Sequence, residues 1–593
     1  MFNSRSPQGK LFGAKNLYLD YVGRDTFYGF LSQHQGTLFH DEDFADLYST
    51  SNGRPCVPPS LLATALLLQT YDRVSDEEAT NRAAFDIRWK AALDAEIDEQ
   101  PFAKSTLQLF RAKLILHDKA RDLFIASIEH AKSQGFLKHR KKLHIAIDTM
   151  AILGRGAVKD TYNLLADGII QLVRTLATIA DVTSEQWAAR HDLNRYFESS
   201  IKTTEDVNWD DDASRKQFLA GIVSDADRLL DIARNIRNQY DPDSEAAVAI
   251  AQASGLLLQL LNQDIDRKPD GPEIIKGVAK DRVCSVHDPE MRHGRKSSKG
   301  RFNGHKGVIA VDTESQLITA VDELPGNAHD SEKVLEVVEQ SEANVAMEAA
   351  ETIGDCAYGT GEVRRQYDET GRKLEAPVPA EPENGKLSKS KFTISRDESR
   401  VTCPGGSTTK QFNYVTVTKA NGNSYKVKRF IFSATQCAQC PLRDQCVKGG
   451  GGRSITLHPQ ERLMKSARRH QKSKAFKEAK RRRQTVEHRI ARLRQLGVRQ
   501  SRYFGRTKTL FQLLMAATVA NLTLVAASVA SAASSFVLIL ATVRRLYRTV
   551  AYNSITNGIM SLASRLRQEH LSKSSAVFQA RSGSGNGAFR LGF

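Results

Sequence analysis

The sequence has few cysteines and lacks an apolar segment at its N-terminus. Seven of the 593 residues are cysteine, which is a small and odd number for a chain of this length. A fold held together by disulfide bonds is therefore not expected. The first residues, MFNSRSPQGKLFG, contain no apolar core of the kind that a secretory signal peptide needs. We therefore expect a cytoplasmic protein.

Acidic residues are scarce in one part of the chain. Between Arg453 and Lys508, 19 Lys and Arg stand against three acids, a local net charge of +16 in a chain whose total is +17. The rest of the chain is close to neutral. A basic run can simply be the solvated face of a helix. This concentration instead favours a polyanionic partner, with DNA or RNA as the first candidate.

The remaining composition, 40% hydrophobic and 26% charged residues, is that of an ordinary globular protein. At roughly 150 residues per domain, the length predicts about three or four domains. Residues 1–140 have apolar positions at helical spacing. Pro58 and Pro59 suit the entrance of one helix, and Ser75 with the acids after it suits the cap of the next. A further helix is predicted from Ser105, which would cap it. This region could bind DNA or serve only for packing.

Strand patterns begin after this helical region. Leu143 to Asp148 alternates in polarity as a strand does. A long helical region follows to about Gln263. HKGVIAVDTESQLITAVDELPG then predicts a β-hairpin, SEKVLEVVEQSEA a helix, and ETIGD a strand that ends near Asp355. The segment from FTISRD to YKVKRFIFSAT is β-rich, and the basic segment follows it as a helix.

Three acids stand out from this pattern. Asp148 ends the apolar run HIAID and is followed by a Gly-rich turn, and Asp355 repeats the arrangement in ETIGDCAYG. Glu487 is almost alone among cations, and on a helix it shares a stripe with Arg483 and Arg494. The neighbouring stripe is apolar: Val486, Ile490, Leu493 and Gly497.

Three carboxylates from distant parts of the chain suit a pair of Mg²⁺ ions, which prefer oxygen ligands. Two such ions about 3.5–4 Å apart stabilise the attacking and leaving oxygens of a displacement at phosphorus. Arg483 and Arg494 could hold phosphates. Each acid also has a plainer interpretation, because an Asp at a strand end often caps a turn and Glu487 could form a helical salt bridge.

The chain resembles DDE transposases of bacterial insertion sequences, and it looks closest to the family numbered 1182. The resemblance extends from about Gly53 to Leu522. GRPCVPPSLLATALLLQTYDRVSDEEA is similar to their helical N-terminal domain, IDTMAILGRGAVKDTYNLL to their first-Asp block and GDCAYG to their second-Asp block. RRRQTVEHRIARLRQLGVRQSRYFGRTK resembles their Glu block.

The Glu block of related transposases reads Tyr, two residues, Arg, three residues, Glu, six residues, Lys. Arg483 and Glu487 fit this pattern. Lys480 takes the place of the Tyr and Arg494 that of the Lys, so positive charge is kept or added. The resemblance also implies DNA contacts for Arg489 in this block, and for Lys306 and Tyr358 in the blocks before it.

The resemblance implies an RNase H-like α/β core, a mixed five-stranded sheet with helices, with Asp148 on its first strand and Asp355 after its fourth. It implies hydrolysis of double-stranded DNA at the ends of the element, and transfer of the released 3′-OH groups into target DNA. Asp148, Asp355 and Glu487 would bind two Mg²⁺, which Mn²⁺ could replace. A homodimer or larger synaptic complex is expected, at the bacterial nucleoid. A transposase that only binds DNA is the rival hypothesis.

Four of the seven cysteines cluster in sequence. Cys403 lies upstream of a C-x₂-C-x₅-C pattern formed by Cys437, Cys440 and Cys446. Four thiolates could form a structural Zn²⁺ site. The 33 residues between Cys403 and Cys437 are a long interval, and reduced, buried or redox-active thiols are the alternative.

No charged residue occurs from Thr509 to Val543, a length that could span a membrane. Its Ala, Ser and Thr content favours a helix buried in a protein, so no membrane partner is expected. The full prediction is an all-α domain at 1–140, a catalytic core at 141–172 and 276–380, a helical insertion at 173–275, a β-rich Cys-containing insertion at 381–452, the Glu-bearing helix at 453–525, and an apolar helix with a flexible tail at 526–593.

Overall fold

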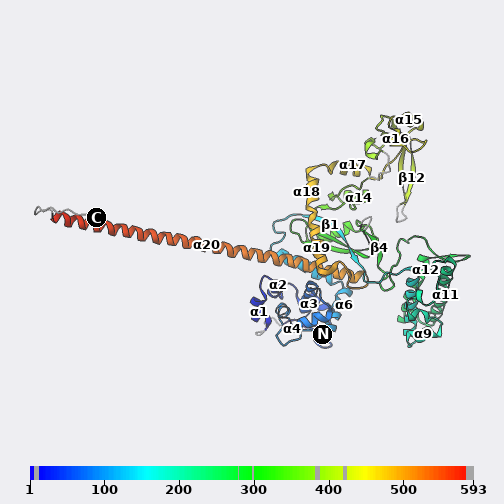
Figure 1. Ribbon diagram of the computed structural model, residues 1–593, viewed down its shortest axis with the longest axis horizontal. Coiled ribbons are helices and arrows are strands. Elements are labelled where there is room, and N and C mark those ends of the chain that lie inside the picture. Colours follow the sequence, from blue (N-terminus) through cyan, green and yellow to red (C-terminus); the bar gives the residue numbers. More distant parts are fainter. Residues whose placement is uncertain (6–12, 278, 297–299, 381–386, 419–423, 582–593) are drawn as a thin grey trace. The chain divides into compact units, whose positions relative to one another are not determined.

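The structure, a computed structural model, describes residues 1–5, 13–277, 279–296, 300–380, 387–418 and 424–581 (Figure 1). The chain divides into two compact units, Met1–Leu524 and Val525–Phe593. The first unit holds a mixed α/β fold with the central sheet, and the described part of the second continues helix α20 (Arg506–Arg581).

The N-terminal region is helical, as predicted. Pro59 opens α3, which is buried from Pro59 to Gln69. Ser75 caps α4, where its hydroxyl accepts the backbone N–H of Glu78 at 3.1 Å. The elements are α1 (Ala14–Val22), α2 (Phe27–Gln33), η1 (Asp41–Leu47), α3 (Pro59–Asp72), α4 (Asp76–Phe85), α5 (Ile87–Leu93), α6 (Lys104–Leu116) and α7 (Ala120–Ser133).

The structure differs in two respects from the helix predicted to start at Ser105. It begins at Lys104 without a side-chain cap, so the predicted Ser cap is wrong. The apolar pattern continues past Leu116, but the chain breaks into α6 and α7 because Asp118 has a left-handed conformation with φ of 51°. A left-handed residue interrupts the hydrogen bonding of a right-handed helix.

The central sheet is mixed and has the strand order β4-β5-β1-β7-β8, with β6 also paired to β5. β5 is antiparallel to β1, β4 and β6, whereas β7 is parallel to both β1 and β8. This arrangement is compatible with the expected core, and the short β4 adds a strand to the five that were expected. The strands are β1 (Leu143–Leu153), β4 (Arg292–Arg295), β5 (Arg301–Asp312), β6 (Ile318–Pro325), β7 (Ala349–Ile353) and β8 (Leu374–Glu375).

Strand β1 is central and longer than its sequence pattern indicated. The predicted strand ended at Asp148, but β1 continues to Leu153, so Asp148 lies in mid-strand and not at a tip. The antiparallel partner β5 explains the difference, because it pairs with β1 as far as Gly304 and so holds the second half of the strand extended. The pairing of β1 with β7 has an irregularity between Leu143 and His144.

Helices pack against the sheet. Helix α13 (Val334–Val345) contacts β5 and β6, and α19 (Gln484–Leu493) contacts β1 and β5. The start of α20 also packs there, because a Cβ atom at Gly307 of β5 would lie 3.0 Å from Leu513. This packing buries the sheet and holds the side chains that project from β1 in fixed positions.

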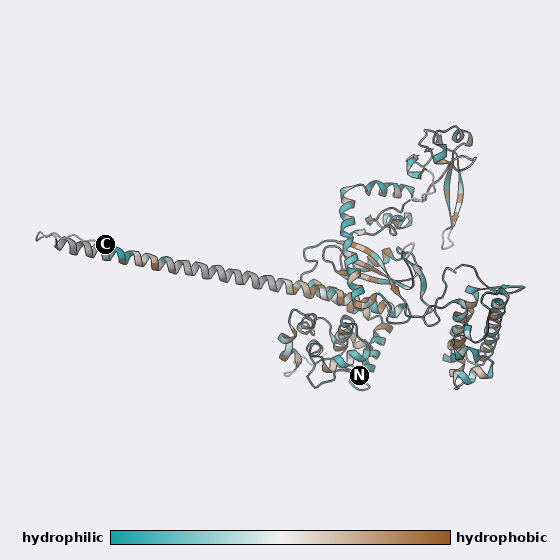
Figure 2. Cartoon of the chain, viewed as in Figure 1, coloured by the Kyte–Doolittle hydropathy of each residue, from teal (hydrophilic) through white to brown (hydrophobic). Residues whose placement is uncertain are grey.

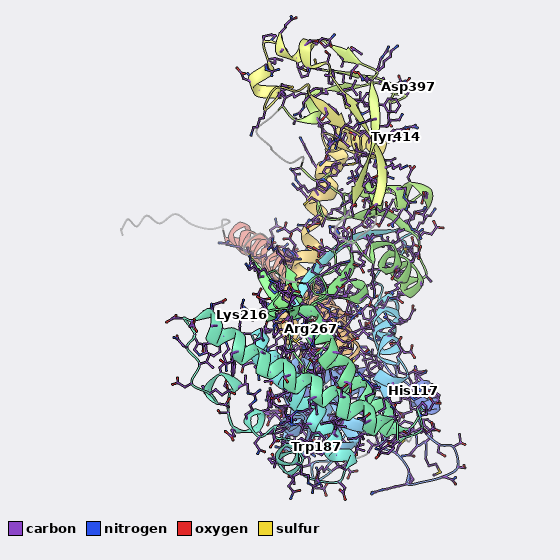
Figure 3. All side chains as sticks on the ribbon, turned by 90° about the vertical axis from the view of Figure 1, so that its right-hand side faces the viewer. His117, Trp187, Lys216, Arg267, Asp397 and Tyr414 are labelled. Carbon is purple, nitrogen blue, oxygen red and sulfur yellow. The ribbon has the colours of Figure 1, made fainter. Side chains whose placement is uncertain are left out.

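The insertion after β1 is helical up to the predicted end near Gln263, and it has a core of its own that includes Leu172, Trp187 and Leu257. Ion pairs such as Arg267–Asp227 at 2.7 Å lie on its surface. Figure 3 labels Arg267 and Lys216 among the side chains of this insertion. Its elements are α8 (Thr161–Ile179), α9 (Ser184–Arg190), α10 (Arg195–Glu198), η2 (Ile201–Thr203), α11 (Asp212–Arg237), α12 (Glu245–Asp264), β2 (Ile265–Lys268) and β3 (Gly271–Ile274).

The second insertion is β-rich, as predicted, and follows α14 (Gly361–Glu369). Strands β9 to β11 form one three-stranded sheet and β12 to β14 another. The elements are η3 (Lys389–Lys391), β9 (Thr393–Ile394), β10 (Val401–Thr402), β11 (Thr408–Thr409), β12 (Phe412–Thr418), β13 (Ser424–Ile431), α15 (Ala434–Ala438), α16 (Arg443–Cys446) and β14 (Ser454–Thr456).

The basic segment is helical but not one helix. It forms α17 (Glu461–His470), α18 (Lys474–Arg482), α19 and the π-helical turn η4 (Arg494–Val498). Figure 2 shows α17 and α18 as hydrophilic and the central strands as hydrophobic. Val486, Ile490 and Leu493 form the predicted buried stripe. Gly497 ends the helical path with φ of 94°.

Within the described residues, one helical stretch, Arg506–Ser531, is long and apolar enough to cross a membrane. Two thirds of its most apolar window (67%) is buried inside the protein. It therefore fits the predicted core helix better than a membrane span. Helix α20 includes the first part of the tail that was predicted to be flexible, and residues 582–593 of that tail lie outside the described residues.

Candidate catalytic site

Asp148 projects from the middle of β1 and is largely buried, with 9% of its surface exposed. Its Oδ1 accepts the backbone N–H of Thr149 at 2.7 Å, and Lys296 Nζ lies 3.9 Å from the same oxygen. Burial raises the pKa of Asp148, while Lys296, the Thr149 N–H and Arg483 act in the opposite direction. Asp355 raises it further, so the two carboxylates are electrostatic neighbours.

Asp355 reaches this place because β7 runs parallel to β1. Ala146 pairs with Ile353, and each acid comes two residues later along its own strand direction. The Asp355 carboxylate accepts the backbone N–H of Ala357 at 2.8 Å, which holds it in the turn after β7. The structure thus brings together two acids that are more than 200 positions apart in the sequence.

Glu487 is linked to this pair through an arginine. Arg483 donates from Nη1 to Asp148 Oδ2 at 3.0 Å and from Nη2 to Glu487 Oε1. The positively charged guanidinium therefore lies between the two carboxylates, where a metal ion could otherwise bind. Glu487 itself is exposed to solvent.

The three acids do not form a ready-made ligand shell. Across the described residues, no group of three or more His, Cys, Asp or Glu is placed so that it could hold a metal ion. The donor set nevertheless fits a divalent ion, since it consists of carboxylate oxygens. The bridging guanidinium shows that Asp148 and Glu487 already share one positive charge.

The end of α18, directly before α19, is held by a second ion cluster that the sequence did not predict. Arg482 donates to Glu351 of β7 at 2.5 Å, and His144 Nδ1 of β1 lies 2.8 Å from the same carboxylate oxygen. This cluster ties the end of α18 to both acid-bearing strands. Arg482 lies in a run of like charges, so the sequence pattern contained no signal that singled it out.

Lys296 was also missed, although it approaches Asp148 and donates to the Thr149 hydroxyl at 3.2 Å. The basic segment MRHGRKSSKGR before β5 was the available signal. Lys480 and Arg494 are exposed, as a DNA contact requires.

Three residues predicted to contact DNA lie in the interior of the structure, and their contacts with DNA stay a prediction. Arg489 is buried and donates to the Ala520 carbonyl at 2.7 Å, and burial lowers its pKa to about 10. Tyr358 is fully buried. Lys306 is buried too and pairs with Asp330 at 2.7 Å. The burial of these three residues comes from segments that are distant in the sequence, so the neighbouring residues did not indicate it.

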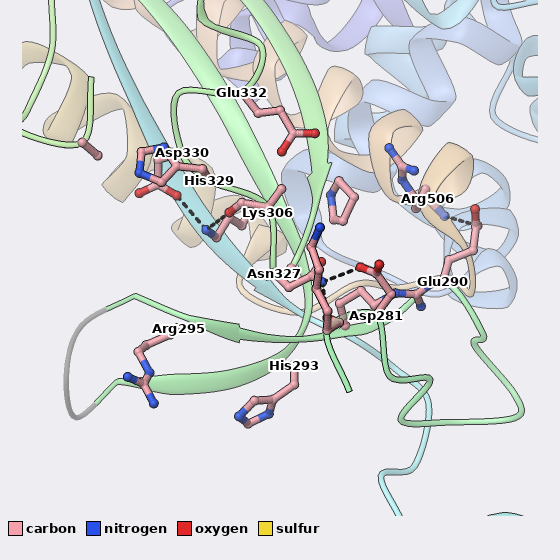
Figure 4. Close-up of a pocket in the computed structure, with 16 residues that line it drawn as sticks. Asp281, Glu290, His293, Arg295, Lys306, Asn327, His329, Asp330, Glu332 and Arg506 are labelled. Atoms are coloured by element: carbon pink, nitrogen blue, oxygen red, sulfur yellow. Dashed lines mark hydrogen bonds and ion pairs between the residues drawn. The ribbon is translucent and has the colours of Figure 1, made fainter. Parts of the chain in front are cut away.

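A polar pocket of about 890 Å³ lies beside this centre (Figure 4). Ala357, two residues after Asp355, lines it together with Lys306 and Arg506. The close-up shows the Lys306–Asp330 pair on one side and Arg506 with Glu290 on the other. Its charges are mixed.

Four cysteines of the β-rich insertion, Cys403, Cys437, Cys440 and Cys446, line a separate small cavity. All of them are free thiols.

A sheet that presents two carboxylates, beside helices rich in cations, is what an enzyme acting on nucleic acid needs. Comparison with protein families agrees, since residues 18–113 match the family described as transposase domain (DUF772). Residues 402–526, which include Glu487, match the family described as transposase DDE domain. No curated protein and no solved structure matches the chain.

Two separate parts of the chain thus match transposase families, and the resemblance to DDE transposases of insertion sequences is confirmed. The DDE domain implies an enzyme that acts on DNA and depends on a divalent metal ion. The assignment to the family numbered 1182 stays a prediction.

Proposed function

We propose that the chain is a DNA transposase with an RNase H-like core, which hydrolyses DNA at the ends of its element and transfers the 3′-OH groups into target DNA. The observation that carries this proposal is the convergence of Asp148 on β1 with Asp355 just after the neighbouring parallel strand β7, with Glu487 joined to Asp148 through Arg483.

Asp148, Asp355 and Glu487 would hold two Mg²⁺, and Mn²⁺ can replace them. When bound, such ions stabilise charge on the attacking and leaving oxygens of the phosphate. The strand mount keeps Asp148 in one orientation, because Thr149 N–H holds one of its oxygens. Arg483 can exchange its carboxylate partners for a DNA phosphate, which guanidinium groups bind in a bidentate manner.

The DNA surface that we propose is formed by the exposed cations of α17, α18, η4 and the turn between α17 and α18. Their charges have few acidic neighbours in this segment, so they can neutralise phosphates. The exposed residues are Arg462, Lys465, Arg469, Lys472, Lys474, Lys477, Lys480, Arg481 and Arg494. Two element ends must be held together, so the active form is a dimer or larger assembly in the bacterial cytoplasm.

The test combines purified protein, Mg²⁺ and a plasmid-borne element with intact ends. Wild-type protein is expected to cut at the ends, whereas Asp148→Asn, Asp355→Asn and Glu487→Gln bind DNA without cutting it. Glu478→Gln is the matched control, because Glu478 is an exposed acid in the same basic segment. A wild-type protein that binds but never cuts would instead favour a repurposed DNA-binding protein.

A further inference from the structure

The β-rich insertion, residues 387–418 and 424–457, has a small hydrophobic core. Its buried cluster consists of eight residues: Phe392, Ile394, Val401, Phe430, Phe432, Cys446, Ile455 and Leu457. A core of this size supplies little stability, and segments of this length commonly depend on a disulfide or a metal ion. The free thiols exclude a disulfide in this structure.

The four cysteines of this insertion come together from separate elements. Cys403 follows β10, Cys437 lies in α15, Cys440 follows α15, and Cys446 ends α16. All four line one cavity of about 30 Å³. A space of this size is too small for a larger cofactor and suits a single ion.

Gly405, in the turn after Cys403, lies close to these sulfur atoms. A Cβ atom at Gly405 would lie 3.0 Å from Cys440 Sγ and 3.7 Å from Cys403 Sγ. A side chain at this position would therefore crowd both sulfur atoms, and glycine leaves the space open.

Two arginines at the cavity have buried donors without acceptors. Arg443 Nη1 and Arg453 Nε make no hydrogen bond within the described part of the chain, although both atoms are buried. A buried, unsatisfied donor destabilises the fold, and more so when it is charged. Both side chains line the same cavity as the thiols. Their placement fits an anionic centre that would accept these donors.

The backbone also supports thiolate character at this place. The backbone N–H of Arg453 donates to Cys437 Sγ at 3.5 Å. The four sulfur atoms line the same cavity, so an ion that they bind together as thiolates must be a cation.

We propose that Cys403, Cys437, Cys440 and Cys446 bind one structural Zn²⁺ and that this ion stabilises the β-rich insertion. Binding replaces up to four S–H protons by four Zn–S bonds and releases those protons. The resulting centre carries a charge of −2, which the guanidinium groups of Arg443 and Arg453 balance. The sulfur atoms are not yet at ligand positions, so binding must draw them to about 2.3 Å from the ion.

The first experiment measures zinc in the full-length protein, purified without chelators, by elemental analysis. One zinc per chain is expected. Cys440→Ser is expected to lose it, and Cys56→Ser, which changes a half-buried cysteine outside the insertion, is expected to keep it. Wild-type protein without zinc would overturn the proposal, and so would equal zinc content in both variants.

The second experiment needs no variant, so a folding defect cannot obscure it. Blocking the thiols of the wild-type protein should release its zinc in step with the modification of four cysteines. A chelator should then make residues 387–457 the first site of proteolysis, while a reductant alone should have no effect. Zinc release without thiol modification, or proteolysis that the chelator leaves unchanged, would contradict the assignment. Neither result bears on DNA cleavage, so this inference is independent of the proposed transposition.

Discussion

Arg483→Gln should strengthen the binding of divalent ions to the protein in the absence of DNA. The guanidinium occupies the position between Asp148 and Glu487 that a metal ion would need. A metal ion must therefore displace it, whereas the neutral amide of Gln offers no comparable competition.

The size of the effect follows from the two ion pairs. The 3.0 Å bond to the largely buried Asp148 is charge-assisted, and after allowance for partial exposure of Arg483 it contributes about 1–2 kcal/mol. The bond to exposed Glu487 adds roughly 0–1 kcal/mol. Loss of the first pair alone corresponds to about a 5- to 30-fold tighter dissociation constant.

The assay is a titration of DNA-free protein with Mn²⁺, followed by electron paramagnetic resonance or calorimetry. Arg494→Gln is the matched control, because Arg494 is exposed and lies further along the same basic segment, at the start of η4. Arg483→Lys should fall between wild type and Arg483→Gln, since an ammonium keeps the charge but cannot bridge both acids as a planar fork does. Unchanged or weaker Mn²⁺ binding in Arg483→Gln would refute the reasoning.

Three further predictions concern folding. Asn521→Leu should lower the free energy of unfolding by about 2–4 kcal/mol in urea denaturation, because its amide satisfies both the N–H and the C=O of Ile318, each at 2.9 Å. Gly304→Ala should prevent folding, judged by solubility and circular dichroism, since φ is 152° and the new Cβ would lie 2.1 Å from a carbonyl oxygen of β1; Gly450→Ala, with open space around it, should match wild type. Burial keeps the pKa of His130 at about 4, so its contribution to stability is complete above pH about 6.5 and is lost as pH falls toward 4. Thermal unfolding should show this loss, and His130→Leu should reduce it.

Much of the candidate site could be predicted from local patterns. Alternation marked the start of β1, an isolated Glu in a basic segment marked Glu487, and the spacing of Val486, Ile490 and Leu493 marked the buried stripe of α19. Each of these signals depends on residues within a few positions of one another, which is where periodicity is informative.

What could not be predicted depends on pairing between distant segments. The extension of β1 beyond Asp148 comes from β5, and the burial of Tyr358 and Arg489 comes from packing of the whole core. The link from Arg482 to Glu351 likewise joins residues 131 positions apart. Side-chain identity alone does not specify such partners.

The irregularity where β7 meets β1 has a consequence for how the site could be lost. Leu143 pairs with Ala349, but His144 pairs with Glu351, so β7 contributes one extra residue at this step. Because of this step Asp355 falls level with Asp148, whereas a regular pairing of the same residues would put Gly354 there and turn the second carboxylate toward the opposite face. Deleting Ala350, the extra residue, would keep the two acids level. Deleting Thr352, which lies after the step, would leave them out of phase, so the place of a one-residue deletion in β7 would decide whether the site is kept.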